Sequence, residues 1–217
     1  MLFRSAGVLF LDEMAEFPRA VLDTLREPLE SGEVVISRVH QRTRFPAAFQ
    51  LIGAMNPCPC GYDGDQDFNC RCTPDQIHRY RSRLSGPLLD RIDLQVQVAR
   101  LRASQLLDPR QSSETSADIR CRVVNAREKQ LERAGKANSH LSSRELETLI
   151  PLPMELRRKL AANVDRMGMS ARAYHRLLKV ARTIADLDNS SHVADHHLAE
   201  AMNYRSFFGA RQSCGSR

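Results

Sequence analysis

The stretch Gly7-Val8-Leu9-Phe10-Leu11-Asp12-Glu13 decides the fold of this chain. Its four consecutive apolar residues, Val8 to Leu11, predict a short strand buried on both faces, as in a parallel sheet covered by helices. Ligands of such sheets bind just beyond the carboxyl ends of the strands. Asp12 and Glu13 therefore stand where a phosphate group or its metal ion would lie. The alternative is a core strand that ends in two solvated acids.

An acid pair at this place is the Walker B arrangement of P-loop ATPases. In that arrangement Asp12 would hold Mg²⁺ and Glu13 would polarise the attacking water. Such a strand should follow a phosphate-binding loop, G-x-x-x-x-G-K-[ST], and its helix. That pattern does not occur in the 217 residues, and only six residues precede Gly7. Either the chain is a truncated product of a longer ATPase, or its other half comes from elsewhere. We expect truncation, and a chain that binds ATP weakly or not at all by itself.

The composition is that of a globular protein of one or two domains. Hydrophobic residues make up 42% of the chain and charged residues 27%. No apolar run approaches the length of a membrane span, and the first residues do not form a signal peptide, so we expect a cytoplasmic protein without a membrane partner. The net charge of +6 favours an anionic partner such as nucleic acid without identifying one.

A helix and a hairpin are expected next. Residues 20–30 have apolar positions at helical spacing and end at Ser31-Gly32, while 33–38 and 42–45 have the composition of two hairpin strands. Four basic residues lie near the tip of this hairpin: Arg38, His40, Arg42 and Arg44. They indicate either a loop that reaches toward nucleic acid or a solvated hairpin whose charges protect an edge strand.

A second buried strand is predicted to end at Asn56. An amide at the carboxyl end of a strand could orient a water or a γ-phosphate. The alternative is an asparagine that caps the turn before Pro57.

Two C-x-C pairs follow this strand: Cys58, Cys60, Cys70 and Cys72. The absence of an export signal argues against a disulfide framework. Four thiolates could close a tetrahedral Zn²⁺ site, although C-x-C is tighter than the usual C-x₂₋₄-C spacing. Free thiols and redox-active pairs are the alternatives. Such a zinc ion would staple a long loop and would not be catalytic, because four cysteines leave no open position for water.

The arginine-rich segment 79–93 contains apolar residues at helix-like spacing, which would leave Arg91 projecting at one end. An arginine presented to a neighbouring subunit's nucleotide is an arginine finger. The alternative is a surface salt bridge with Asp90 or Asp93. Residues 94–98 alternate apolar and polar and are predicted to form the last strand of the sheet.

A polar linker over residues 104–115 predicts a domain boundary, and the rest of the chain has helical patterns. Ser142 with Glu145 forms a capping box. A bundle of four or five helices is expected. Arg172 lies near the start of the fourth helix, where it opposes the helix dipole, and this favours a task other than solvation. The expected helices are 116–133, 142–150, 153–166, 170–187 and 193–204.

In this order, the segments resemble the ComM/YifB-type Mg-chelatase-like AAA+ ATPases of bacteria. The resemblance runs from about Gly7 to Phe207 and rests on the strings GVLFLDE, ESGEVVISR, GAMNPCPCG, RYRSRLSGPLLDRID and ARAYHRLLKVARTIADL. It implies a hexameric motor that uses ATP and Mg²⁺ and acts on DNA, with ComM proteins associated with branch migration during natural transformation.

The resemblance also implies roles for single residues. Asp12 and Glu13 match Walker B, Asn56 matches sensor 1, Arg91 matches the arginine finger, and Arg172 matches sensor 2 as a ligand of the nucleotide phosphate. The hairpin at 33–45 is similar to the pre-sensor-1 hairpin, which in related helicases points into the central pore. Family members also carry an N-terminal Lon-protease-like domain and a Walker A segment, and this sequence contains neither.

The expected fold class is therefore α/β: a partial AAA+ core with a parallel sheet and flanking helices over residues 1–103, the linker 104–115, and a helical lid over 116–210. The leading functional hypothesis is a portion of a DNA-translocating ATPase. Two alternatives stay open: a metal-chelatase motor subunit, and a non-catalytic zinc-containing interaction module.

Overall fold

The computed structural model describes residues 7–38, 41–65, 67–100 and 114–205. The chain divides after Ile92 into an N-terminal unit and a helical unit, and each is described by itself. The sequence places this boundary later, at residue 103. The difference arises because Asp93 forms an ion pair with Arg176 at 2.7 Å, and the Gln95 N–H donates to the Tyr204 carbonyl at 2.7 Å. The expected linker 104–115 lies almost wholly outside the described residues.

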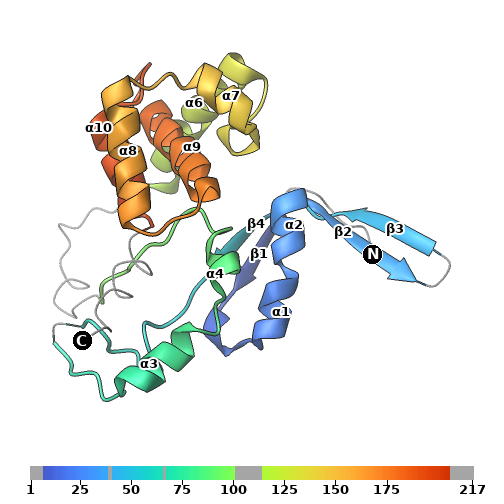
Figure 1. The fold of residues 1–217 in the computed structure, drawn as a ribbon, viewed down its shortest axis with the longest axis vertical. Coiled ribbons are helices and arrows are strands. Elements are labelled where there is room, and N and C mark those ends of the chain that lie inside the picture. The colour runs from blue at the N-terminus through green and yellow to red at the C-terminus, as the bar shows by residue number, and fades with distance from the viewer. Residues whose placement is uncertain (1–6, 39–40, 66, 101–113, 206–217) are drawn as a thin grey trace. The chain divides into compact units, whose positions relative to one another are not determined.

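The N-terminal unit is built on a parallel strand pair, which confirms an α/β fold with a small parallel sheet. Strand β1 (Gly7–Leu11) pairs with β4 (Phe49–Gly53), and their last residues, Leu11 and Gly53, are direct partners (Figure 1). The expectation that β1 is buried on both faces is wrong. Val8 and Phe10 are 63% and 59% exposed, because no element among the described residues packs on that face of the sheet.

A proline divides the helix expected at residues 20–30. The structure has α1 (Arg19–Thr24) and α2 (Arg26–Ser31), preceded by the 3₁₀ turn η1 (Met14–Glu16). Pro28 cannot donate an N–H to the carbonyl of Thr24, and its ring crowds that carbonyl, so α1 ends there. Helix α2 ends as expected at Gly32, whose φ of 70° suits a residue without a side chain.

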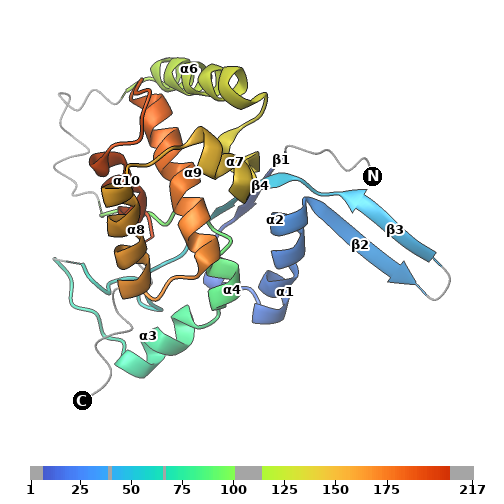
Figure 2. The same ribbon diagram turned by 45° about the horizontal axis from the view of Figure 1, so that its top comes forward.

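The predicted hairpin is confirmed. Strands β2 (Glu33–Arg38) and β3 (Gln41–Pro46) are antiparallel, and they extend away from the β1–β4 sheet in both views of the ribbon (Figures 1 and 2). Residues 39 and 40, at the tip, lie outside the described part of the chain.

The arginine-rich segment contains two short helices, α3 (Pro74–Arg81) and α4 (Gly86–Leu89). Thr73 begins α3 with a capping box to Gln76. The strand expected at residues 94–98 is wrong. These residues are described and form no strand, and Val98 is 86% exposed.

The helical unit confirms all five expected helices to within two residues at each end. Its core is formed by α7, α8, α9 and α10 with the segments between them, and α6 packs against α9. The elements are α6 (Ser116–Ala134), the 3₁₀ turn η2 (Asn138–His140), α7 (Ser143–Leu149), α8 (Met154–Arg166), α9 (Ala171–Leu187) and α10 (Asp195–Asn203).

A buried polar network joins α6 to α9. The Asp186 carboxylate, 1% exposed, accepts hydrogen bonds from Arg182 on its own helix, from Arg133 at the end of α6, and from Asn138 in η2. Arg182 is also buried and donates to the carbonyls of Ser190 and Ser191. The sequence patterns did not indicate this network, because its members lie far apart along the chain.

Candidate nucleotide site and cysteine cluster

The predicted acids lie at the carboxyl end of the parallel strand pair. Backbone pairing continues beyond both strands, since the Ala54 N–H donates to Leu11 at 2.9 Å and the Met14 N–H donates to Ala54 at 2.8 Å. Asp12 and Glu13 therefore run beside Ala54, two residues before Asn56. The structure brings the three predicted polar residues to one edge of the sheet, and all three are exposed to solvent.

Glu13 has an unusual backbone. Its φ of 48° and ψ of 42° place it in the left-handed region, where a residue with a side chain is strained. The strained turn is supported by Asp12, whose Oδ1 accepts the Glu13 N–H at 2.9 Å. Strain of this kind concentrates at functional sites, so the backbone supports a special role for Glu13. The sequence gives no signal for it, because glycine or asparagine would be the expected residue here.

The turn after Glu13 is held from two sides. A Cβ on Gly53 would lie 2.6 Å from the Met14 Sδ, so this glycine allows the buried Met14 to close against the end of β4. On the other side, Arg83 Nη1 donates to the Ala15 carbonyl and to the Glu16 carboxylate, each at 2.7 Å. Arg83 therefore helps to fix the turn that follows Glu13, a role that no pattern in the sequence indicated.

Arg91, the predicted arginine finger, makes a contact within its own unit. Its guanidinium is ion-paired to the Glu30 carboxylate of α2 and donates to the Pro87 carbonyl at 2.7 Å. The Arg91 side chain is only 10% exposed. Glu30 is a partner that sequence spacing did not suggest, because it lies on α2, far from Arg91 along the chain. A role as an arginine finger stays a prediction, and it requires Arg91 to exchange Glu30 for a nucleotide phosphate.

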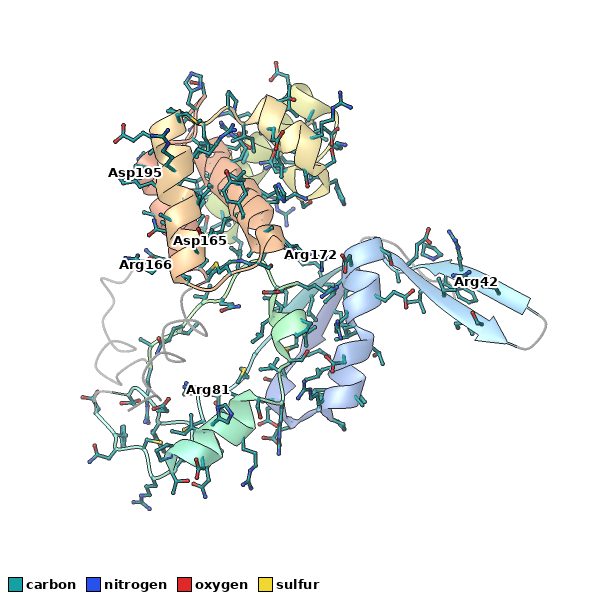
Figure 3. All side chains as sticks on the ribbon, viewed as in Figure 1. Arg42, Arg81, Asp165, Arg166, Arg172 and Asp195 are labelled. Atoms are coloured by element: carbon teal, nitrogen blue, oxygen red, sulfur yellow. The ribbon has the colours of Figure 1, made fainter. Side chains whose placement is uncertain are left out.

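Arg172, the predicted sensor 2 residue, is the second residue of α9 and is exposed (Figure 3). It belongs to the helical unit, whereas Asp12, Glu13, Asn56 and Arg91 belong to the N-terminal unit. Its role at the nucleotide also stays a prediction.

The basic residues of the hairpin fall into three cases. Arg42 and Arg44 are exposed on the same face of β3, where they pair with Ser37 and Val35 of β2. Arg42 is the second residue of β3 and lies toward the tip of the hairpin (Figure 3). Arg44 also approaches Glu33 at 3.8 Å, a contact between two well-exposed side chains that contributes little. The Arg38 backbone pairs with Gln41 at the end of β2, and His40 lies outside the described residues.

The four predicted cysteines converge. Their sulfurs all lie within 4.8 Å of one another, with Cys58 Sγ 3.3 Å from Cys60 Sγ and 3.6 Å from Cys70 Sγ. A disulfide requires about 2.05 Å, so these are free thiols. Sulfurs around one zinc ion, each about 2.3 Å from the metal, stand about 3.8 Å apart. The cluster is close to that geometry and fits a thiolate-bound metal ion.

The cysteines of the cluster differ in acidity. Hydrogen bonds from the backbone N–H groups of Tyr62 and Arg71 lower the pKa of Cys60 to about 6. The Cys72 N–H acts in the same direction on Cys70, but burial and the neighbouring sulfurs outweigh it and raise the pKa of Cys70 to about 12. Burial raises the pKa of Cys72 as well. A divalent metal ion would stabilise the thiolate form of its cysteine ligands.

The end of α3 holds the chain between Asn56 and the cysteines. Arg81 is the last residue of α3 (Figure 3). Its Nε donates to the Pro57 carbonyl at 3.0 Å, and its Nη2 forms an ion pair with Asp63 at 2.5 Å. Both members of this pair have side chains only 17% exposed. The adjacent Tyr80 has a raised pKa because it is buried and lies near Glu16, and a backbone hydrogen bond from Asn56 acts in the opposite direction.

Comparison with known proteins identifies the family. The family model described as magnesium chelatase, subunit ChlI, matches residues 3–106, and the model of the ChlI C-terminal region matches residues 113–205. The chain belongs to the Mg-chelatase-like family. It is an AAA+ Mg-chelatase-like protein of the ComM/YifB type, as the sequence motifs predicted.

The relatives that it matches are longer. It is 50% identical over 200 residues to the competence protein ComM of Haemophilus influenzae, and 46% identical over 200 residues to the uncharacterized protein YifB of Escherichia coli. Each alignment covers 92% of this chain and 39% of the relative. A Mycobacterium tuberculosis relative is 38% identical over 210 residues, which cover 95% of this chain and 41% of that protein.

Within the described residues, no helix combines the length and the apolar character that a bilayer crossing requires.

Proposed function

We propose that this chain forms part of an ATP-dependent motor that acts on DNA. The observation that carries the proposal is that the parallel strands β1 and β4 end at directly paired residues, Leu11 and Gly53. Asp12 and Glu13 therefore lie beside the segment that leads to Asn56. Nucleotides bind at this edge of open α/β sheets. The family supports the same chemistry, because its members are AAA+ Mg-chelatase-like proteins.

In this proposal each polar residue has one task. Asp12 holds Mg²⁺ bound to ATP, Glu13 polarises the attacking water, and Asn56 orients that water or the γ-phosphate. Arg91 and Arg172 neutralise phosphate charge, the first from a neighbouring subunit of a hexamer. The described residues include the acids and the amide, and the sequence has no phosphate-binding loop, so these 217 residues are expected to bind ATP poorly by themselves.

DNA is the proposed substrate because of the hairpin. Arg42 and Arg44 share an exposed face of a projecting two-stranded element, and guanidinium groups bind phosphate oxygens well. The name of the Haemophilus influenzae relative, competence protein ComM, fits a DNA-handling role in natural transformation. Branch migration is the activity that we propose for the motor.

A metal-chelatase motor subunit is the second candidate, and the family description favours it. The exposed arginines of the hairpin favour the DNA motor. Zn²⁺ is the ion that we propose for the cysteine cluster, in addition to ATP and Mg²⁺ at the strand ends. The third candidate is a non-catalytic interaction module. Its function would depend on the cysteine cluster but would not be affected by substitution of Glu13.

The test is DNA-stimulated ATP hydrolysis. The protein to test is a chimera that joins the N-terminal part of the longer Haemophilus influenzae relative to residues 7–217 of this chain. We expect forked DNA to raise its hydrolysis rate several-fold, and the Arg42→Ala/Arg44→Ala variant to lose that stimulation but keep the basal rate. Hydrolysis that DNA does not change would favour the chelatase motor. No hydrolysis in a chimera that assembles as a hexamer would favour the interaction module.

A further inference from the structure

The loop that carries the four cysteines is also the loop that carries Asn56. It runs from residue 54 to residue 73, and its described residues form no helix or strand. Loops of this length need a reason to be ordered, because few backbone hydrogen bonds fix them. Cys58 and Cys60 follow Asn56 almost directly, and Cys70 and Cys72 come just before Thr73, the N-cap of α3.

Two connections therefore join the same parts of the chain. At the start of α3, the cysteine cluster would link Cys72 to Cys58, whose side chain is fully buried. At the end of α3, Arg81 binds the Pro57 carbonyl and Asp63. Pro57 is itself held by Arg81 through its carbonyl and directly precedes Cys58, and its ring fixes φ, so little freedom remains between Cys58 and Asn56.

We propose that Cys58, Cys60, Cys70 and Cys72 bind one structural Zn²⁺ ion that fixes the position of Asn56 at the edge of the sheet. Zinc is the favoured metal because four thiolates in tetrahedral arrangement form a closed site, with no position left for water or substrate. The ion acts through Pro57, the one residue that separates Cys58 from Asn56, and Asn56 is in this sense a positioned residue. This inference relies on the proposed function only for the task of Asn56, whereas metal binding and loop order stand independently of it.

A cysteine outside the cluster provides a matched control. Cys121 is exposed on α6 in the other unit, so Cys121→Ser removes a cysteine without touching the loop. Arg81→Met removes the second connection but keeps all four cysteines, so it separates loss of metal from loss of the loop's other support.

The first measurement is metal content. The full chain is purified under reducing conditions, exposed to Zn²⁺, passed over a weak chelator, and analysed for zinc and iron. We expect about one zinc per chain in the unaltered protein and in Cys121→Ser, and less than about a tenth of that in Cys58→Ser and Cys70→Ser. Equal zinc in all four proteins, or none in the unaltered protein, would overturn the site. Iron in place of zinc would overturn the choice of metal.

The second measurement is hydrogen exchange of the peptide that covers residues 54–62, in the same protein before and after removal of zinc with a mercurial and a strong chelator. We expect at least about tenfold faster exchange in that peptide, no change in a peptide from α9, and recovery when zinc is returned. The Arg81→Met variant should keep its zinc. With zinc bound, its 54–62 peptide should exchange faster than in the unaltered protein, but by less than zinc removal causes. Unchanged exchange after the metal has gone would overturn the positioning role. Neither measurement uses ATP or DNA, so failure of the proposed function would leave both results interpretable.

Discussion

The substitution Asp186→Asn tests the buried network of the helical unit. It keeps the size of the side chain but removes the negative charge that faces the Arg133 and Arg182 guanidinium groups. The Asp186 side chain is fully buried, and its carboxylate accepts five hydrogen bonds of 2.6 to 3.1 Å. The variant would leave the Arg182 cation, 3% exposed, without a counter-charge.

The expected loss is about 3 to 5 kcal/mol in the free energy of unfolding, the usual cost of removing one partner from a buried ion pair. That is a large part of the roughly 5 to 15 kcal/mol available to a domain, and it corresponds to a fall in Tm of more than about 10 °C. Urea unfolding followed by far-UV circular dichroism measures the loss. The control is Lys159→Met, which breaks an exposed pair with Asp195 and should leave the free energy of unfolding almost unchanged.

The same network predicts a pH dependence. Burial alone would raise the pKa of Asp186, but the hydrogen bonds and charges of Arg133, Asn138 and Arg182 outweigh it and lower that pKa below 3.8. A carboxyl group with a lowered native pKa contributes stability above its unfolded pKa and loses it as the pH falls through the native value. We therefore expect the contribution to be complete above about pH 5 and to fall away below about pH 4. A cost of Asp186→Asn under about 1 kcal/mol at neutral pH would refute this reasoning.

Three further predictions concern a cap, a strained turn and the hairpin. Ser142→Ala removes the side chain that accepts the Glu145 N–H at the start of α7, and it should destabilise the helical unit by about 1 kcal/mol in the same urea assay; no change would show that the cap is dispensable. Glu13→Gly relieves the left-handed backbone and should stabilise the N-terminal unit by about 1 kcal/mol, whereas Glu13→Ala should not; equal effects would argue against strain. Arg42→Ala/Arg44→Ala should weaken binding of labelled DNA in fluorescence anisotropy and reduce the slope of log K against log salt concentration by about 1 to 2. The control Arg157→Ala/Arg158→Ala on α8 should do neither, and equal losses in both variants would contradict a hairpin contact.

Local signals in the sequence predicted most of the fold. The helices of the second unit were predicted because capping residues and apolar spacing act within a few residues of each other, as at Ser142. The hairpin 33–45 was found from its β-branched and basic strands. The division of α1 from α2 could also have been predicted, since Pro28 lies inside the expected helix and removes a backbone donor.

Contacts between distant residues could not be predicted in this way. The ion pair of Arg91 with Glu30 on α2 joins residues about 60 positions apart, and no local pattern predicts it. The stretch 94–98 has the pattern of a strand, yet a strand needs a partner, and backbone contacts place Gln95 beside Tyr204 instead. The left-handed backbone of Glu13 and the link from Arg81 to Pro57 depend on the packed structure and have no pattern in the sequence.

The most direct test of the central claim is the substitution Glu13→Gln in the chimera with the Haemophilus influenzae segment. The amide keeps the size of the side chain and removes the charge that polarises water, so Mg·ATP should still bind while hydrolysis falls by at least about a hundredfold. Binding is measured with a fluorescent ATP analogue and hydrolysis by phosphate release. Loss of hydrolysis with binding retained is the result that this account predicts. Hydrolysis at the unaltered rate would contradict it, because the acids at the end of β1 would then have no part in the reaction.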